Sequence, residues 1–268
     1  MVKKKPKGIL KVDQVKEKKG ISCDALKCIA MLTMALNHIA HICVIPGTWL
    51  SVTMIGVGYF TGPLMCWLIV DGYHHTRSLK KYALRLFIFA LISQIPYSLA
   101  LSSKIISFTE YNMMFTLLCC LGITAAWYEI QNERLKGLII VGLIAVTYFC
   151  DWSIIGPLLT IYYLHFGKDK EGLKKACFLG AASVAIMMTI INIDGESLIL
   201  FDSAILGGIL TGIIAGAATA SAGLSYIYLY NGKKAKRGGT FFKWFFYIFY
   251  PGHLLILGII RLIISGII

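Results

Sequence analysis

The sequence contains few charged residues for its length. Only 15% of its 268 residues are Asp, Glu, Lys or Arg, whereas 57% are apolar, and the mean hydropathy is +0.74. Soluble globular proteins carry about 25% charged residues, so a water-soluble globule of this composition would expose too much hydrocarbon. The scarcity of charge therefore predicts an all-α membrane protein, a polytopic bundle of transmembrane helices.

Marks of several other protein classes are also missing. The eight cysteines show no C-x-x-C spacing, so the sequence predicts neither a metal site nor a disulfide framework. No internal repeat, low-complexity linker or soluble domain is visible. The basic leader is too long and polar for a signal peptide, and the apolar run after it has no small-residue cleavage site. We expect a basic cytoplasmic tail over residues 1–20 and a single transmembrane domain over residues 21–268.

Long apolar runs are what the sequence has in abundance. Runs of about 17 to 25 apolar residues indicate membrane spans. They predict about nine transmembrane helices, at 25–45, 51–70, 82–101, 113–128, 137–150, 153–166, 176–193, 200–230 and 244–266. Two of these, 137–150 and 153–166, are short enough to form a re-entrant pair, and 200–230 is interrupted by Asp202.

Positive charge is distributed unevenly among the predicted loops. If the N-terminus is cytoplasmic, the cytoplasmic segments hold 22 of the 26 Lys and Arg residues, and Lys104 alone lies in an outer loop. This asymmetry follows the positive-inside rule with an odd number of crossings. The net charge of +13 thus reflects the orientation of the protein in the membrane, with its basic segments facing anionic headgroups of the lipid bilayer. We expect no nucleic-acid partner.

The first predicted span, which includes LKCIAMLTMALNH, carries a polar stripe. At about 100° per residue, Lys27 and His38 fall within about 20° of one another on a helix, and Asp24 and His41 flank them on the same face. At about 1.5 Å per residue, Lys27 and His38 are about 16 Å apart along the axis. The lysine is therefore expected at the cytoplasmic mouth and the histidine near mid-membrane.

Polar side chains at that depth cost several kcal/mol unless a bundle interior or wet cavity satisfies them. One interpretation is a functional cavity that includes Lys27, Asn37, His38 and His41. The other is that Lys27 snorkels to the headgroups and His38 bonds a neighbouring helix.

The K-x10-H spacing from Lys27 to His38 resembles the R-x10-H feature of the acyltransferase-3 superfamily, with lysine in place of arginine. A fuller resemblance is to the TraX family of integral membrane proteins. It rests on DALKCIAMLTMALNH, GYHHTRSLKKYALRLFIFALISQIPY, NMMFTLL, DWSIIGPL and YNGKKAKRGG…FFYIFYPGHLLIL, which occur in that order between about residues 22 and 258.

The resemblance implies a membrane acyltransferase of the bacterial cytoplasmic membrane, using acetyl-CoA or another acyl-CoA as donor and no metal. The motif pair falls on Lys27 and His38, and the other matching blocks mark Asp24, His75, Arg77, Arg85, Asn112, Asp151 and His253. The chain departs from the family pattern where acids are common, at Asn37 and Gln94. These departures leave the histidine base with less support and put the family's usual pilin substrate in question.

General chemistry assigns roles to these residues. A histidine near its ordinary pKa of about 6.5 suits a base or an acyl carrier, which favours His38. We expect Asn37, Asp151 or a residue of another span to orient its imidazole, and Asp24 and His41 to belong to the same catalytic group. Cationic side chains suit the phosphates of acyl-CoA. We expect donor binding by Lys27, Arg77, Arg85 and His75, and acceptor or cavity roles for Asn112, Asp151 and His253, with the last helix opened at Pro251-Gly252.

Other functions remain open at this point. We expect the acceptor to be a pilin-like protein or a surface glycan. For the membrane protein itself, a homodimer is a further expectation. A secondary transporter would also place ionisable residues and broken helices near the membrane midplane, although the second half of the chain does not echo the first. A non-catalytic assembly factor is the third alternative, and it would be indifferent to the loss of His38.

Overall fold

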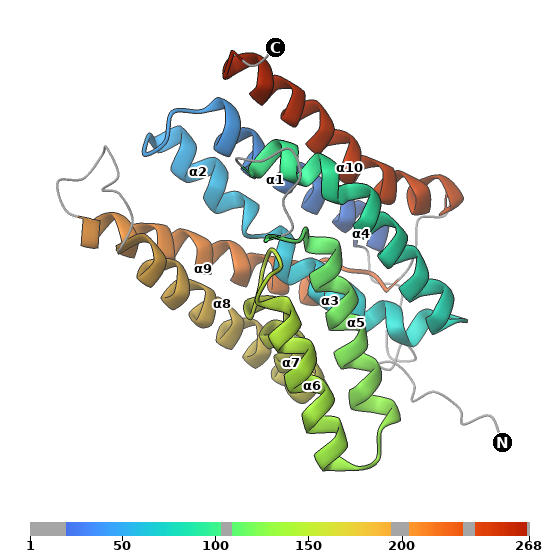
Figure 1. The fold of residues 1–268 in the computed structure, drawn as a ribbon. Helices are drawn as coiled ribbons and strands as arrows, with labels where there is room; N and C mark the ends of the chain where they lie inside the picture. Colours follow the sequence, from blue (N-terminus) through green and yellow to red (C-terminus); the bar gives the residue numbers. More distant parts are fainter. Residues whose placement is uncertain (1–19, 103–108, 194–203, 233–238, 267–268) are drawn as a thin grey trace.

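A computed structural model describes residues 20–102, 109–193, 204–232 and 239–266 (Figure 1). Within these ranges all regular structure is helical. The helices are α1 (Cys23–Cys43), α2 (Trp49–Gly58), α3 (Thr61–His75), α4 (Leu79–Leu101), α5 (Met113–Glu129), α6 (Glu133–Thr147), α7 (Ile155–Phe166), α8 (Lys170–Ile193), α9 (Ala204–Tyr228) and α10 (Gly239–Ile264). Most of the predicted tail, Lys104 and Asp202 lie outside the described residues.

Small polar residues begin many of these helices. Ser22, Thr48 and Ser78 accept hydrogen bonds from backbone N–H groups in the first turns of α1, α2 and α4. Asn112 and Asn132 do the same for α5 and α6. Side-chain caps of this kind satisfy donors that a helix start leaves without partners. The boundaries are therefore encoded locally, in the short polar segments between apolar runs.

The helices confirm a polytopic membrane bundle. Six stretches are long and apolar enough to cross a bilayer: Cys23–Cys43, Trp49–His75, Leu79–Leu101, Lys170–Asn192, Ile205–Tyr228 and Trp244–Ile264. The apolar helices Met113–Glu129 and Ile155–Phe166 are shorter. The predicted spans 137–150 and 153–166 correspond to two separate helices, α6 and α7, joined by residues 148–154.

The predicted span 51–70 lies within the apolar stretch Trp49–His75, and its helix is interrupted between α2 and α3. The N–H groups of Tyr59 and Phe60 bond to Gly56 and Val57, three residues back, which tightens and ends α2. The side-chain amide of Asn37 donates to the carbonyl of Ile55 at 3.0 Å. A partner on α1 thus binds a carbonyl in the last turn of α2, where intrahelical donors run out.

The prediction that Pro251-Gly252 opens the last helix was wrong. Helix α10 continues through Pro251 from Gly239 to Ile264. Proline removes one backbone donor, and neighbouring helices commonly accommodate that loss in a membrane bundle. Helix α4 runs beside α10 along much of its length (Figure 1).

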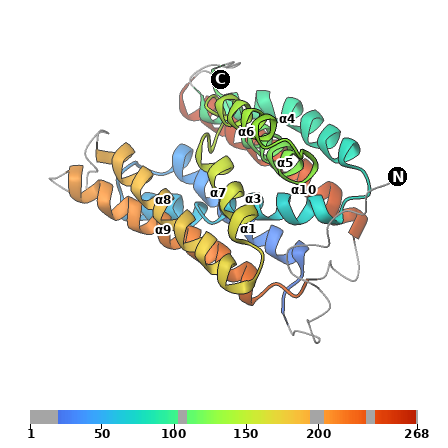
Figure 2. The same ribbon diagram turned by 90° about the horizontal axis from the view of Figure 1, so that it is seen from below.

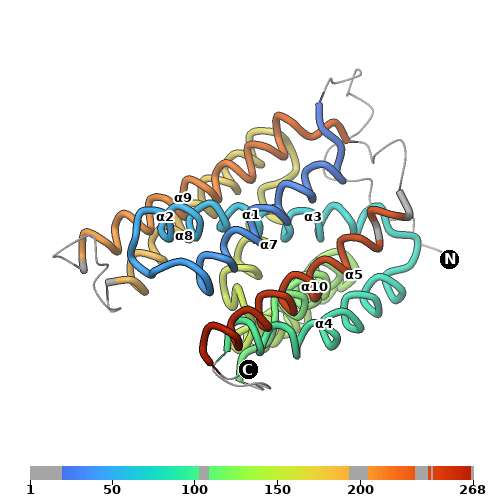
Figure 3. The backbone as a smooth tube through the Cα atoms, turned by 90° about the horizontal axis from the view of Figure 1, so that it is seen from above, coloured from blue at the N-terminus to red at the C-terminus, as the bar shows by residue number. Residues whose placement is uncertain are grey.

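The helices are grouped in space. Helices α8 and α9 form a close pair that extends from one flank of the bundle (Figure 2). The view from above shows α1 between that pair and the α4–α10 pair (Figure 3). Backbone bridges join the segment around Ile21 to that around Tyr230, and the segment around Tyr111 to that around Cys150. Both pairings agree with the predicted alternation of crossings, whereas the cytoplasmic position of the N-terminus stays a prediction.

Candidate functional site: two cavities along the first helix

Two cavities lie along α1 and meet inside the bundle. The first, here called the basic cavity, has a volume of about 790 Å³ and contains Lys27 in its wall. The second, the histidine cavity, has a volume of about 540 Å³ and contains His38. Four residues line both cavities: Met34, Thr61, Met113 and Tyr250. We call these four residues the partition.

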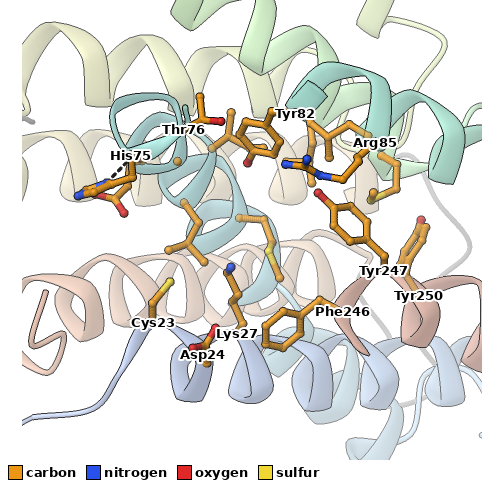
Figure 4. Close-up of a pocket in the computed structure, with 18 of the residues that line it drawn as sticks. Cys23, Asp24, Lys27, His75, Thr76, Tyr82, Arg85, Phe246, Tyr247 and Tyr250 are labelled. Carbon is orange, nitrogen blue, oxygen red and sulfur yellow. Dashed lines mark hydrogen bonds and ion pairs between the residues drawn. The ribbon is translucent and has the colours of Figure 1, made fainter. Parts of the chain in front are cut away.

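The basic cavity gathers the residues predicted to bind the donor. Lys27, Arg77, Arg85 and His75 all line it. Figure 4 shows that Lys27, on α1, and Arg85, on α4, project into the same space from opposite walls. Lys81 is a further cation there. Elements far apart in the sequence thus converge to make one positively charged site.

Aromatic rings, more than acids, hold the two inward-facing cations. The Lys27 ammonium lies 5.1 Å from the ring centre of Phe246, and the Arg85 guanidinium lies 5.8 Å from that of Tyr82. The Nε atom of Arg85 is buried, and no described residue is hydrogen-bonded to it. A buried guanidinium N–H of this kind favours an anionic ligand. His75 is half exposed at the rim, where Nδ1 bonds the carbonyl of Asp71 at 2.9 Å.

A pair of imidazoles lies at the histidine cavity; His38 lines this cavity, whereas His253 lines neither cavity. His38 is 7% exposed, and its Nδ1 lies 2.9 Å from Nε2 of His253 on α10. The Nδ1 of His253 lies 2.9 Å from the carbonyl oxygen of Phe249. A carbonyl oxygen only accepts, so Nδ1 of His253 carries the proton. In neutral His253, Nε2 is then the acceptor, and Nδ1 of His38 donates to it.

This relay fixes the tautomer of His38. With its proton on Nδ1, the other ring nitrogen, Nε2, has a lone pair available. No described residue is hydrogen-bonded to that Nε2, and His38 lines the cavity. The arrangement is that of a base whose second nitrogen is held by an orienting partner. Sequence reasoning marked both histidines but not their contact.

The other candidates on α1 divide between the two cavities. Asn37 and His41 line the histidine cavity with His38. The Asn37 amide is engaged by Ile55 at the α2–α3 break, so the partner of His38 is His253, not Asn37. Asp24 is buried and lines the basic cavity beside Lys27. Asp24 is absent from the wall of the histidine cavity that His38 lines.

Asn112 serves the backbone instead of a cavity. It is fully buried, and its Nδ2 donates to the Ala90 carbonyl at 2.8 Å and to Gln94 Oε1 at 2.9 Å. Gln94 in turn donates through Nε2 to the Glu110 carbonyl at 2.8 Å. A carboxylate could not make that last bond, which gives a local reason for Gln94 where the family pattern has an acid. Asn112 is absent from both cavity walls.

Asp151 lies in the turn between α6 and α7 and lines the histidine cavity. Burial raises its pKa to about 6; a backbone hydrogen bond from Trp152 opposes this shift and the charge of Glu110 adds to it. Trp152 adopts φ 58°, and its ring fills the space that a side chain at Gly62 would occupy. The turn is therefore fixed against α3, with one acid facing the cavity.

Several cavity residues were missed by sequence reasoning. Glu110 and Arg261 line the histidine cavity with Asp151, and Tyr250 lies in the partition. Arg261 donates to the carbonyls of Ala100 and Ser102 at the end of α4. The sequence could have marked Arg261 as a cavity residue, because it is a cation inside a predicted span. No sequence feature marked Tyr250, because a tyrosine in an aromatic run is typical of an interfacial belt.

These features define a class: a multi-pass helical membrane protein with a cationic cavity along α1 and an imidazole pair between α1 and α10. The chain belongs to the TraX protein family, whose model matches residues 22–261, and it is accordingly a protein of the bacterial inner membrane. It is 29% identical over 239 residues to the probable fimbrial assembly protein FimC, serogroup H1, of Dichelobacter nodosus, covering 87% of this chain and 92% of that protein. No solved structure matches the chain.

Proposed function

We propose that this protein is a membrane-embedded acyltransferase. It takes an acyl group, in the simplest case acetyl, from acyl-CoA in the basic cavity and passes it to an acceptor in the histidine cavity. The observation that carries the proposal is the His38–His253 pair, 2.9 Å apart. His38 lies on the same face of α1 as Lys27, and the partition of four residues lines both cavities.

The basic cavity suits the charged part of the donor. Acyl-CoA brings several phosphate charges, and arginine and lysine are the usual partners for phosphate. Lys27 and Arg85 project into the cavity, and Arg85 has a buried donor without a described partner. The rise of α1 places His38 about 16 Å from Lys27. An extended arm between the phosphates and the thioester would span that distance.

The histidine pair suits the chemical step. Nε2 of His38 takes the proton of the acceptor nucleophile while the nucleophile attacks the thioester carbonyl carbon. The tetrahedral intermediate collapses, the C–S bond breaks, and the thiolate takes the proton back from His38. His253 keeps the proton of His38 on Nδ1 and stabilises the imidazolium that forms between the two steps.

The acceptor is proposed from the relative. The similar protein of Dichelobacter nodosus is named as a probable fimbrial assembly protein. We therefore propose a role in pilus assembly or pilin modification, with a pilin-like protein as acceptor and a surface glycan as the alternative. Glu110, Asp151 and Arg261 offer this acceptor both signs of charge.

One observation favours a second candidate, a secondary transporter. Two cavities that meet at a four-residue partition could alternate in access, with the imidazole pair as a proton site. The two functions differ in one result: only the acyltransferase releases free CoA from acyl-CoA.

The test uses the full-length protein purified in detergent with radiolabelled acetyl-CoA. We expect slow CoA release alone, and faster release with transfer of label when a peptide amine or a sugar is added. His38→Gln should abolish both. His74→Gln is the matched control, because His74 packs against Tyr73 and Tyr128 and lines neither cavity. Wild-type protein that binds acetyl-CoA without any turnover would contradict the proposal.

A further inference from the structure

Tyr250 occupies the one place where both proposed substrates meet. It is 6% exposed and lines both cavities. On α10 it follows Phe246 by four residues and precedes His253 by three, so the three side chains share a helix face. Its ring centre is 5.8 Å from that of His253. The same face thus contacts Lys27 through Phe246 and His38 through His253.

The Tyr250 hydroxyl has a defined orientation. The backbone N–H of Met113, the first residue of α5, donates to the phenolic oxygen at 3.3 Å. The neighbouring N–H of Met114 is taken by the side chain of Asn112. Because the phenolic oxygen accepts from Met113, its own hydrogen points elsewhere, and no described residue accepts that hydrogen.

We propose that Tyr250 is a catalytic residue that stabilises the oxyanion of acyl transfer. The inference rests on the proposed acyltransferase function. As the acceptor nucleophile bonds to the thioester carbon, the π electrons of the carbonyl move to its oxygen. The Tyr250 hydroxyl donates a hydrogen bond to that oxygen, without transferring its proton. When the C–S bond breaks, the electrons return to the carbonyl and the hydrogen bond weakens.

Two physical features make this hydroxyl suited to the task. The positive end of the α5 dipole lies at Met113, and the N–H bond from that end polarises the phenol. A preorganised donor in a site shielded from water is worth more than the same donor in solution. His38 takes the proton of the acceptor, and Tyr250 stabilises the negative charge on the carbonyl oxygen. Each charge that develops during the reaction therefore has a residue that stabilises it.

The first test compares Tyr250→Phe with wild-type protein. Loss of a single oxyanion donor typically lowers kcat by about 10² to 10³, so we expect that decrease, with KM for acetyl-CoA within about twofold. Tyr162→Phe is the matched control. Tyr162 lines neither cavity, and its hydroxyl lies 3.2 Å from that of Ser183, so its kcat should stay near the wild-type value.

A second measurement separates catalysis from a structural role, because Tyr250→Phe also removes the bond from Met113. Fluorotyrosines of increasing acidity are introduced at position 250, at a pH where each stays protonated. A hydroxyl that donates to a developing oxyanion gives a kcat that changes steadily with phenol acidity. Thermal stability should not follow that trend, whereas a merely structural hydroxyl would leave kcat independent of acidity.

The outcomes distinguish this inference from the function on which it rests. If wild-type protein turns over, His38→Gln is inactive and Tyr250→Phe retains kcat within about threefold, the role of Tyr250 is wrong and the acyltransferase proposal stands. If wild-type protein releases no CoA with any acceptor, the acyltransferase proposal fails and this inference fails with it. A kcat insensitive to fluorination would likewise remove Tyr250 from the chemistry.

Discussion

The two cavities along α1 differ in how their polar groups are held. In the basic cavity, Lys27 and Arg85 lie against aromatic rings, and the buried Nε atom of Arg85 is hydrogen-bonded to no described residue. In the histidine cavity, His38 is hydrogen-bonded to His253, which is itself held by the Phe249 carbonyl. The first arrangement is adaptable and cationic, whereas the second fixes a tautomer. The proposed binding site and the proposed site of chemistry thus lie along one helix face, with Lys27 and His38 about 16 Å apart.

The difference between the two cavities predicts different kinetic effects of substitutions in each. Changes in the basic cavity should alter an interaction made equally in the ground and transition states, and so raise KM. Changes in the histidine cavity should alter interactions made in the transition state, and so lower kcat.

The largest effect is expected for His38→Gln. Removing a positioned general base costs about 10² to 10⁴ in rate, whereas one polar contact between transmembrane helices contributes only about 0.6 kcal/mol. We expect kcat to fall by that factor with insertion and acetyl-CoA binding retained, as measured by turnover and calorimetry. His41→Ala, one turn further along the stripe, should be milder. The reverse ranking would place the base at His41, and full activity in both variants would favour the transporter.

A smaller loss is expected for His253→Phe, which keeps a ring but removes the acceptor for Nδ1 of His38. Without that partner the imidazole populates both tautomers and turns more freely, and we expect kcat to fall by about 10² with KM unchanged. His253→Gln, whose amide oxygen can accept from His38, should recover part of that loss. Equal activity in the two variants would mean that His253 only fills space.

Lys27→Ala and Arg85→Gln should affect KM instead. A hydrogen bond to a charged group contributes about 1.5–3 kcal/mol, so the loss of either should raise KM for acetyl-CoA by about tenfold or more. Salt should weaken wild-type binding in the same direction. Lys136→Ala is the control, since Lys136 pairs with Glu133 on α6 and lines neither cavity. Unchanged acetyl-CoA affinity in both variants would remove these residues from the donor site.

The sequence predicted the helical class and the polar face of α1. Both predictions have a physical basis. A membrane enforces long apolar runs, and a 3.6-residue period places Lys27 and His38 on one face wherever that helix packs. Hydropathy could not show the break at Tyr59 and Phe60, because both sides of the break are apolar. At the break, Asn37 on α1 donates to the Ile55 carbonyl, and this contact joins residues of two different helices.

Contacts between distant helices were beyond the reach of periodicity. His38 and His253 are 215 residues apart in sequence, and only packing of α1 against α10 brings them together. The same holds for Tyr250 and Met113. Pro251 shows the opposite error, since a local rule predicted an opened helix and the surrounding bundle kept it closed. The predicted homodimer and the cytoplasmic N-terminus stay predictions.

The smallest effect is expected at Asp151, and it concerns stability. Burial raises the pKa of this carboxyl to about 6 from an ordinary value of 3.8, so the folded state holds the proton more tightly than the unfolded state. The favourable contribution of the neutral acid is fully present below about pH 4 and is lost as the pH rises through 6.

Asp151→Asn mimics the neutral acid at every pH. Its Tm should equal that of wild-type protein at pH 4 and exceed it by several °C at pH 7.5, where the wild-type carboxyl is ionised. Glu110→Gln removes the neighbouring negative charge and should reduce the pH dependence in part. Thermal unfolding in detergent at the two pH values measures both variants, and a Tm difference independent of pH would show that the Asp151 carboxyl does not titrate in this range.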